Sequence, residues 1–270
     1  MRSLVSTHVS KHLLPVAVLL ILTCLLLSAC DEATTDQSVT TSPQQATITA
    51  PIADIETAPQ EVTFATEDGL TLSGTLYGSG IHLVVLAHMY PADQTSWAEQ
   101  AQRLADMGYL VLTFDFRGYG DSEGSKDIAN IDRDVRAAAD GFLEYTKATD
   151  IVLVGASMGG TACLNVASGL QGSNAVRLAG VISYSAQVEF MGQSAQEAVP
   201  AIQVPMLFIA AENDEGAAGA QALYDLSGGT ADLQILSGGD HGTNLFLGTE
   251  AAEAERLLDE FLAEYMPLTD

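Results

Sequence analysis

The sequence predicts an α/β fold built on an eight-stranded, mostly parallel sheet with helices on both faces. Continuous apolar runs recur between residues 81 and 211, which is typical of strands that are buried on both sides. Segments with helical periodicity separate these runs, and alternating strands and helices favour a parallel sheet. No internal repeat and no second change of composition follow residue 60, so we expect one domain over residues 61–270.

The first two strands differ from the rest. The segments "VTFAT" (62–66) and "LTLSGTLY" (70–77) alternate apolar and polar residues around Asp68-Gly69, a hairpin signal, and predict an antiparallel pair with one solvated face. Buried strands are then expected at 81–87, 109–116, 151–155, 178–184 and 205–211, with a last strand at 231–236. Helices are expected at about 94–107, 128–147, 157–170, 216–226 and 250–265.

The chain is strongly acidic. It has 35 Asp and Glu against 10 Lys and Arg, which gives a formal net charge of -25. Such a surface repels a phosphate backbone, so we expect no nucleic-acid partner. The simplest interpretation of the acidity is a well-solvated exterior, and it disfavours anionic substrates.

The N-terminus has the features of an export signal. Arg2 and Lys11 flank the start of an apolar stretch at 13–27, which small residues and Cys30 follow. The run "LSAC" (27–30) resembles the bacterial lipobox, in which the cysteine is lipidated and becomes the first residue of the mature protein. The resemblance implies a signal peptide over 1–29 and an extracytoplasmic protein held at the membrane by lipid on Cys30. An uncleaved membrane-spanning helix is the alternative.

Residues 30–60 are expected to form a disordered tether. Residues 31–60 contain seven threonines, three prolines and five acidic residues, with no Lys, Arg or Gly. This composition buries too little apolar surface to offset the entropy of ordering the chain. If Cys30 carries lipid, Cys163 is left without a disulfide partner and is expected to be a small core residue.

The motif "GASMG" (155–159) predicts a nucleophile at the end of a buried strand. Ligands of parallel sheets bind at the carboxyl ends of the strands, and G-x-S-x-G is a sharp turn from strand to helix that projects the serine Oγ from the sheet. The glycines let strand and helix approach each other closely. We therefore predict Ser157 as the nucleophile. The segment "GDSEG" (120–124) also matches, but Ser122 lies well beyond its strand and no apolar helix follows it.

A serine hydroxyl needs an adjacent base to act as a nucleophile. His82, His88 and His241 remain after removal of the signal. His82 falls inside a strand, and His88 precedes the serine, whereas enzymes built on this turn carry serine, acid and histidine in that order. His241, in the glycine-rich loop after the last strand, is the predicted base.

The acid that orients the histidine is expected after the strand at 205–211. Asp214 is our choice there, with Glu212 and Glu215 as alternatives. Asp240 adjoins the histidine, but a neighbour in a turn rarely presents its carboxylate to the next ring, so we expect a solvated or loop-capping acid.

These motifs resemble those of the α/β-hydrolase superfamily, near the compact, esterase-like dienelactone hydrolase and serine aminopeptidase-like branches. The resemblance covers residues 61–268, and it is carried by "LAHMYPAD", "FDFRGYGDSEG", "GASMGG", "AENDEGA" and "GDHGT". It implies an oxyanion hole made by the backbone N–H groups of Met89 and Met158, with His88 shaping that hole. Arg117 and Asp115 would hold the loop after the fourth strand. Dienelactone hydrolases carry cysteine where this chain has serine.

The resemblance implies a serine hydrolase that works through an acyl-enzyme without metal or cofactor. About twenty residues between Tyr184 and Pro205 are too few for a helical cap, so we expect no large cap domain and an open site. The expected substrate is a small carboxylic ester of short to medium acyl length; peptide or amide hydrolysis, acyl transfer and a purely binding lipoprotein remain alternatives. The sequence does not indicate an oligomeric state. Each of seven residues could line an acyl pocket or could equally belong to the core: Met89, Tyr90, Met158, Tyr184, Phe190, Met191 and Phe246.

Overall fold

The computed structural model describes residues 58–268, apart from 142, 144–145, 173–174 and 230. The expected signal peptide, the lipidation site at Cys30 and the tether up to residue 57 lie outside the described residues and stay predictions. Within the part of the chain that the structure describes, no helix has the length and apolar character needed to cross a membrane.

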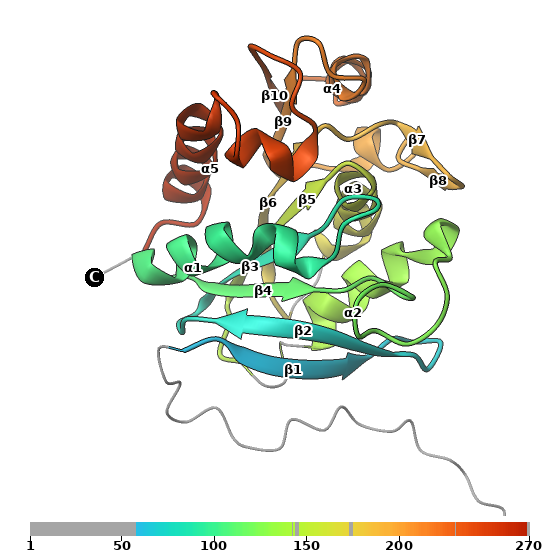
Figure 1. Ribbon diagram of the computed structural model, residues 1–270, viewed down its shortest axis with the longest axis vertical. Coiled ribbons are helices and arrows are strands. Elements are labelled where there is room, and N and C mark those ends of the chain that lie inside the picture. The colour runs from blue at the N-terminus through green and yellow to red at the C-terminus, as the bar shows by residue number, and fades with distance from the viewer. Residues whose placement is uncertain (1–57, 142, 144–145, 173–174, 230, 269–270) are drawn as a thin grey trace, which may run out of the picture. The chain divides into compact units, whose positions relative to one another are not determined.

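Eight strands form one sheet, in the order β1-β2-β4-β3-β5-β6-β9-β10 (Figure 1). β2 runs antiparallel to β1 and β4, and the other neighbours are parallel, as predicted. The strands are β1 (Gln60–Ala65), β2 (Thr71–Tyr77), β3 (His82–Ala87), β4 (Leu110–Phe114), β5 (Asp150–Ala156), β6 (Arg177–Tyr184), β9 (Met206–Ala211) and β10 (Ala231–Leu236).

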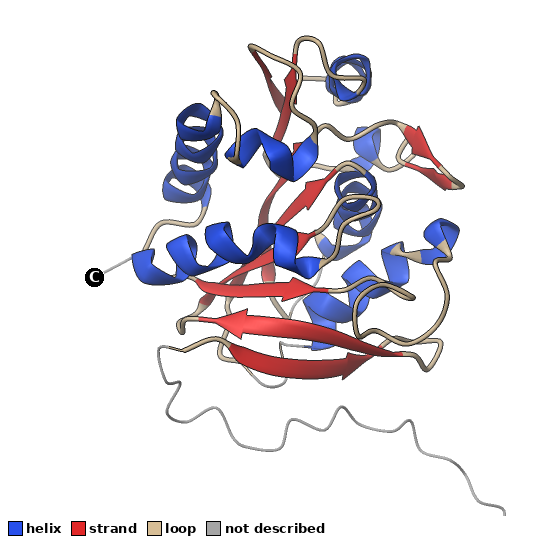
Figure 2. Ribbon diagram, in the orientation of Figure 1, coloured by secondary structure: helices blue, strands red, loops and turns tan. Residues whose placement is uncertain are grey.

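Helices cover both faces of the sheet (Figure 2). On one face, α1 (Ala98–Met107) and α5 (Ala251–Tyr265) pack on the strands, and on the other face α2 (Asp132–Gly141), α3 (Met158–Leu170) and α4 (Gly216–Leu226) do so. This double cover explains why the central strands are continuously apolar. Short 3-10 helices lie at Gln94–Trp97, Ile128–Asn130, Val199–Ala201 and Gly242–Phe246.

The single helix predicted for 128–147 was wrong in its extent. The chain first makes the 3-10 turn Ile128–Asn130, and α2 then runs only from Asp132 to Gly141. Glycine has a low helix propensity, which explains why the helix stops there.

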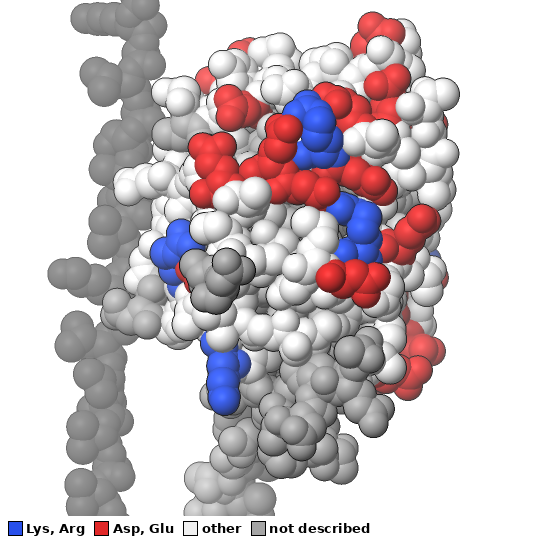
Figure 3. All heavy atoms as spheres, turned by 90° about the vertical axis from the view of Figure 1, so that its left-hand side faces the viewer, with Lys and Arg blue, Asp and Glu red and all other residues white. Residues whose placement is uncertain are grey.

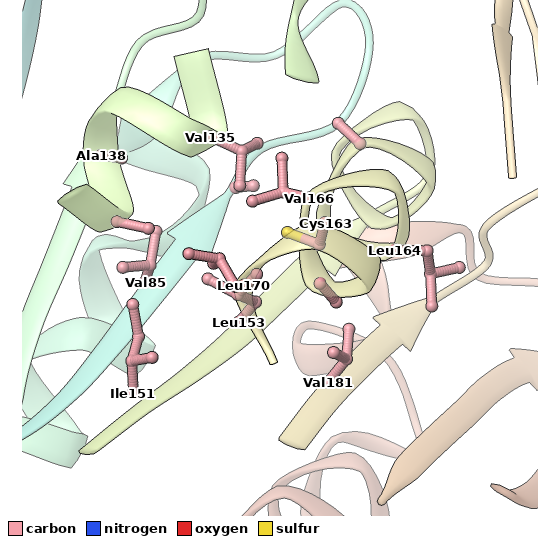
Figure 4. Close-up of a cluster of buried hydrophobic side chains, with 14 of the residues drawn as sticks. Val85, Val135, Ala138, Ile151, Leu153, Cys163, Leu164, Val166, Leu170 and Val181 are labelled. Atoms are coloured by element: carbon pink, nitrogen blue, oxygen red, sulfur yellow. The ribbon is translucent and has the colours of Figure 1, made fainter. Parts of the chain in front are cut away.

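The core below α2 and α3 is tightly filled (Figure 4). Val85 and Leu153 from the sheet lie against Val135 of α2 and Leu170 of α3. Cys163 points into the same cluster and is fully buried, and this burial raises the pKa of its thiol. Cys163 is therefore the small core residue that the sequence predicted.

Only a short insertion separates β6 from β9. It consists of the two-residue strands β7 (Glu189–Phe190) and β8 (Gln193–Ser194) and the 3-10 turn at Val199–Ala201. The side chain of Gln193 accepts a hydrogen bond from Asn165 of α3 (2.7 Å) and donates one to the Ala129 carbonyl (3.0 Å). The expectation that no large cap domain covers the sheet is confirmed.

Two separate buried groups fix the loop after β4. The Arg117 guanidinium donates to Asp134 (Nη2 to Oδ1, 2.6 Å) and to Asp68 (Nη1 to Oδ2, 2.8 Å). Asp115 instead accepts from the backbone and side-chain nitrogens of Gln94, both at 2.9 Å. Arg117 and Asp115 thus hold this loop as expected, but they bind different elements and not each other.

Acidic residues dominate the side on which α5 lies (Figure 3). Arg103 of α1 pairs with Asp259 of α5 (2.8 Å), and Arg256 pairs with acids one turn away on its own helix. Arg103 thus joins α1 to α5, and the acidic residues still outnumber the arginines on this side, as the composition indicates.

Candidate active site

Ser157 lies on a strained turn at the carboxyl end of β5. Its backbone has φ 49° and ψ -115°, and α3 begins at the next residue. The Ser157 N–H donates to the Tyr184 carbonyl on the neighbouring strand β6 (2.7 Å). A non-glycine residue in this region of backbone space is strained by roughly 1–3 kcal/mol, and such strain gathers at functional sites.

The glycines around Ser157 make this turn possible. A Cβ added to Gly155 would lie 2.4 Å from the backbone carbonyl of Gly159, and one added to Gly159 would lie 2.5 Å from the Ala87 carbonyl oxygen on β3. Both contacts are with backbone atoms, which cannot rotate away. The spacing of the motif therefore follows from the close packing of α3 on β3 and β5.

Gly155→Ala is expected to lower the free energy of unfolding by about 1–3 kcal/mol or more, because the added methyl group overpacks the turn. Chemical denaturation of the two proteins measures the change. Gly172→Ala is the matched control, because Gly172 has an ordinary φ and no atom of the described residues lies within 4 Å of the added Cβ. Equal stabilities of the Gly155 variant and the control would contradict this account of the turn.

His241 and Asp214 form a hydrogen-bonded pair. The distance from His241 Nδ1 to Asp214 Oδ1 is 2.7 Å, and the Asp214 side chain is 3% exposed against 24% for His241. Asp214 follows β9, and His241 lies in the loop after β10. Among the described residues, neither Glu212 nor Glu215 is hydrogen-bonded to the ring, which leaves Asp214 as its partner.

The pair is polarised in the way that a catalytic base requires. The hydrogen bond to Asp214 raises the pKa of His241 above its ordinary value, against the opposing effect of burial. Burial opposes ionisation of the Asp214 carboxyl, but hydrogen bonds led by the one from His241 lower its pKa. Asp214 is therefore the charged partner that orients the imidazole.

The loop that carries His241 reaches the turn that carries Ser157. A Cβ added to Gly242 would lie 3.4 Å from the Ala156 Cβ and 2.7 Å from the Met89 sulfur. The Thr243 hydroxyl also contacts the Met89 sulfur, at 3.5 Å. The residues next to the predicted base and nucleophile thus lie close together, and the loop after β10 reaches the ends of β3 and β5.

His88 uses both ring nitrogens in structural hydrogen bonds. Nε2 accepts from the Phe116 N–H (3.1 Å), so Nδ1 carries the proton and donates to the Met89 carbonyl (2.9 Å). The ring is fully buried, and burial lowers its pKa. A neutral His88 thus shapes the segment at Met89 and has no free nitrogen for proton transfer.

The backbone N–H groups of Met89 and Met158 are candidates for binding an anion. Neither donates a hydrogen bond to any group within the described part of the chain. Met158 is also the first residue of α3, where the helix dipole favours negative charge. The two residues expected to form an oxyanion hole therefore have their donors available.

The Ser122 hydroxyl makes two structural hydrogen bonds. Its hydroxyl donates to the Asp115 carbonyl (2.6 Å) and accepts from the Ser73 N–H (2.9 Å), so it ties the loop after β4 to β2. This geometry agrees with the sequence-based preference for Ser157.

The expected acyl-pocket residues fall into two groups. Tyr184 and Phe246 are buried in the core with their ring centroids 4.9 Å apart, and the Tyr184 hydroxyl donates to the Ala254 carbonyl, so these two are core residues, the alternative that the sequence left open. Aromatic residues near strand ends fill the layer under α5 here. Tyr90, Phe190 and Met191 are partly exposed, with the rings of Tyr90 and Phe190 6.2 Å apart. Met158 is fully buried, while Met89 keeps partial exposure.

Sequence reasoning missed Ser185. It directly follows β6, is fully buried, and accepts a hydrogen bond from the Gly242 N–H (3.0 Å). The available signal was a hydroxyl residue at the carboxyl end of a buried strand. Within the described residues, no group of His, Cys, Asp and Glu side chains is arranged to hold a metal ion.

Comparison with known proteins agrees with this architecture. A family model described as "alpha/beta hydrolase fold" matches residues 82–186, which include Ser157 but neither Asp214 nor His241. An "Epoxide hydrolase" of Caballeronia sordidicola is 33% identical over 116 residues, or 42% of this chain and 34% of that protein. The chain thus spans about a third of that relative.

Solved structures of esterases have a similar fold at low sequence identity. An esterase of Pyrococcus furiosus matches with a TM-score of 0.65 at 20% identity and covers 77% of this chain and 91% of that one. An esterase of Exiguobacterium antarcticum matches with a TM-score of 0.61 at 17% identity and covers 75% and 99%. At such identities the likeness shows the fold.

Proposed function

From the α/β-hydrolase fold of this chain, we propose that it is a serine hydrolase that cleaves carboxylic esters of short to medium acyl length. Ser157 is the nucleophile, His241 the base and Asp214 the acid that orients it. The observation that carries the proposal is the 2.7 Å hydrogen bond from His241 to Asp214, in a loop that packs against the strained turn of Ser157.

The proposed reaction is acyl transfer to Ser157 followed by hydrolysis. Ser157 Oγ attacks the acyl carbonyl while His241 Nε2 accepts its proton, and Asp214 stabilises the imidazolium through Nδ1. The Met89 and Met158 N–H groups donate to the oxyanion. Collapse of the tetrahedral intermediate breaks the bond between the acyl carbon and the alcohol oxygen, and that oxygen receives the proton from His241. Water, deprotonated by His241, then releases the acid from Ser157.

The chemistry of serine favours an ester over an epoxide. Attack of a serine oxygen on an epoxide carbon would form an ether, which water does not cleave under mild conditions. Attack on a carbonyl forms an ester, which a base and water hydrolyse. The likeness to an epoxide hydrolase therefore supports hydrolysis on this fold, while the hydroxyl at residue 157 supports an acyl substrate.

Hydrolysis of p-nitrophenyl esters of increasing acyl length, with styrene oxide in parallel, tests the proposal. We expect ester turnover with a burst of nitrophenol and no diol from the epoxide. Diol formation without ester turnover would contradict the proposal.

The rate of ester hydrolysis should also depend on pH. The base must be neutral, so kcat/KM should rise with pH through a midpoint above 6.5, because Asp214 raises the pKa of His241. Asp214→Asn should lower both the rate and this midpoint.

A further inference from the structure

Ser185 holds an unusual position beside the proposed triad. It directly follows β6, has φ 56° and is fully buried. Its N–H donates to the Ile209 carbonyl of β9 at 2.7 Å, which fixes it to the strand that leads to Asp214. A positive φ at a buried non-glycine residue is a strained arrangement that its surroundings must stabilise.

The Ser185 side chain contacts the loop that carries the base. Its Oγ accepts the Gly242 N–H at 3.0 Å, and Gly242 follows His241 directly. Since a hydroxyl accepts and donates at the same time, one hydrogen of Ser185 remains to be donated elsewhere.

The same side chain lies beside the carboxylate of the acid. A Cβ added to Gly216 would lie 2.7 Å from both the Cα and the Cβ of Ser185 and 2.8 Å from Asp214 Oδ2. Ser185 and the Asp214 carboxylate therefore both lie next to the Gly216 α-carbon. His241 is hydrogen-bonded to the other carboxylate oxygen, Oδ1. Oδ2 is buried, and no group of the described chain meets it in full hydrogen-bond geometry. Burial raises the pKa of the Asp214 carboxyl, but His241 and then the neighbouring Ser185 side chain lower it.

We propose that Ser185 is a positioning residue whose single hydroxyl holds the His241 loop through Gly242 and orients the Asp214 carboxylate, so that both partners stay in register. The proposal rests on the hydrolase function proposed above. Ser185 acts through its neighbours and does not touch the reacting atoms. One side chain thereby joins the loops after β9 and β10, which a backbone hydrogen bond from the Asn213 N–H to the Gly238 carbonyl (2.9 Å) also connects.

Ser185→Ala and Ser185→Gly test this role together. Both remove the hydroxyl, but glycine adopts a positive φ freely, so the second variant removes the hydroxyl without backbone strain. Ser183→Ala is the matched control, because Ser183 is also buried on β6 and its hydroxyl has no partner among the described groups.

We expect both Ser185 variants to lower kcat by roughly 10- to 100-fold with little change in KM, since misplacing a catalytic group by about 1 Å has effects of this size. The control should keep its kcat. Proton NMR gives a second readout. His241 Nδ1 lies 2.7 Å from Asp214 Oδ1, so its proton should give a low-field signal that broadens or moves upfield in both variants. The acidic side chains whose charges act on the His241 ring are those of Asp214 and Glu215.

The two readouts separate the failure of this inference from the failure of the proposed function. An unchanged kcat and an unchanged low-field signal in both Ser185 variants would overturn the positioning role. Equal changes in Ser183→Ala would also overturn it, because they would reflect general loosening of β6. If the wild type hydrolyses no ester, a low-field signal that depends on Ser185 would still support the positioning role while the hydrolase proposal falls.

Discussion

Ser157→Ala is expected to lower kcat for ester hydrolysis by about 10⁴- to 10⁶-fold, because removing the nucleophile of a serine triad leaves only binding and oxyanion stabilisation. The same change should abolish covalent labelling by a fluorophosphonate, which requires the activated hydroxyl. Both measurements use purified protein, and thermal unfolding of the variant checks that it is folded.

Ser122→Ala is the matched control for this experiment. Ser122 lies in the second copy of the motif, and its hydroxyl is already hydrogen-bonded to Asp115 and Ser73. The control should lose some stability and keep its labelling. Labelling that persists in Ser157→Ala and disappears in Ser122→Ala would reverse the assignment, and an unlabelled wild type would favour a binding protein on a hydrolase scaffold.

Asp134→Ala is expected to lower the free energy of unfolding by about 3–5 kcal/mol, because it leaves the Arg117 guanidinium buried without its main partner. The Asp134 side chain is 0% exposed and that of Arg117 is 4% exposed, so water cannot replace the lost carboxylate. The Arg117 backbone N–H would also lose its acceptor, Asp134 Oδ2, at 2.9 Å. Urea unfolding followed by circular dichroism measures the loss.

Asp140→Ala is the control on the same helix. Asp140 pairs with Arg136 one turn away, with both side chains 45% exposed, and such surface pairs contribute only about 0.3–0.5 kcal/mol. Similar losses in Asp134→Ala and Asp140→Ala would mean that burial does not decide the strength of this ion pair.

The sequence predicts the sheet and the turn at Ser157 well because both depend on local patterns. The apolar runs mark strands buried on two faces, and Gly155 and Gly159 are required by backbone contacts that only glycine permits. Asp214 and His241 follow from the order of the strands, since each lies just past a strand end. The main chain therefore brings them to the same edge of the sheet.

Other features depend on packing between distant segments, which no local pattern records. For Tyr184 and Phe246 the sequence left pocket and core open, and packing against α5 places both in the core. Ser185 has no motif of its own, and its contacts with Gly242 and Asp214 appear only once β6, β9 and β10 lie side by side. Arg117 likewise finds its partners in other segments: Asp68 lies in the hairpin and Asp134 lies in α2.

The strand order also has a consequence for the time at which the enzyme becomes competent. The proposed nucleophile and oxyanion donors lie on strands up to β6, whereas the proposed acid and base follow β9 and β10 at one edge of the sheet. A nascent or partly folded chain would therefore display the hydroxyl without the means to ionise it. If the proposed triad is right, catalysis begins only once the C-terminal quarter has docked on the sheet, and a partly folded molecule hydrolyses nothing.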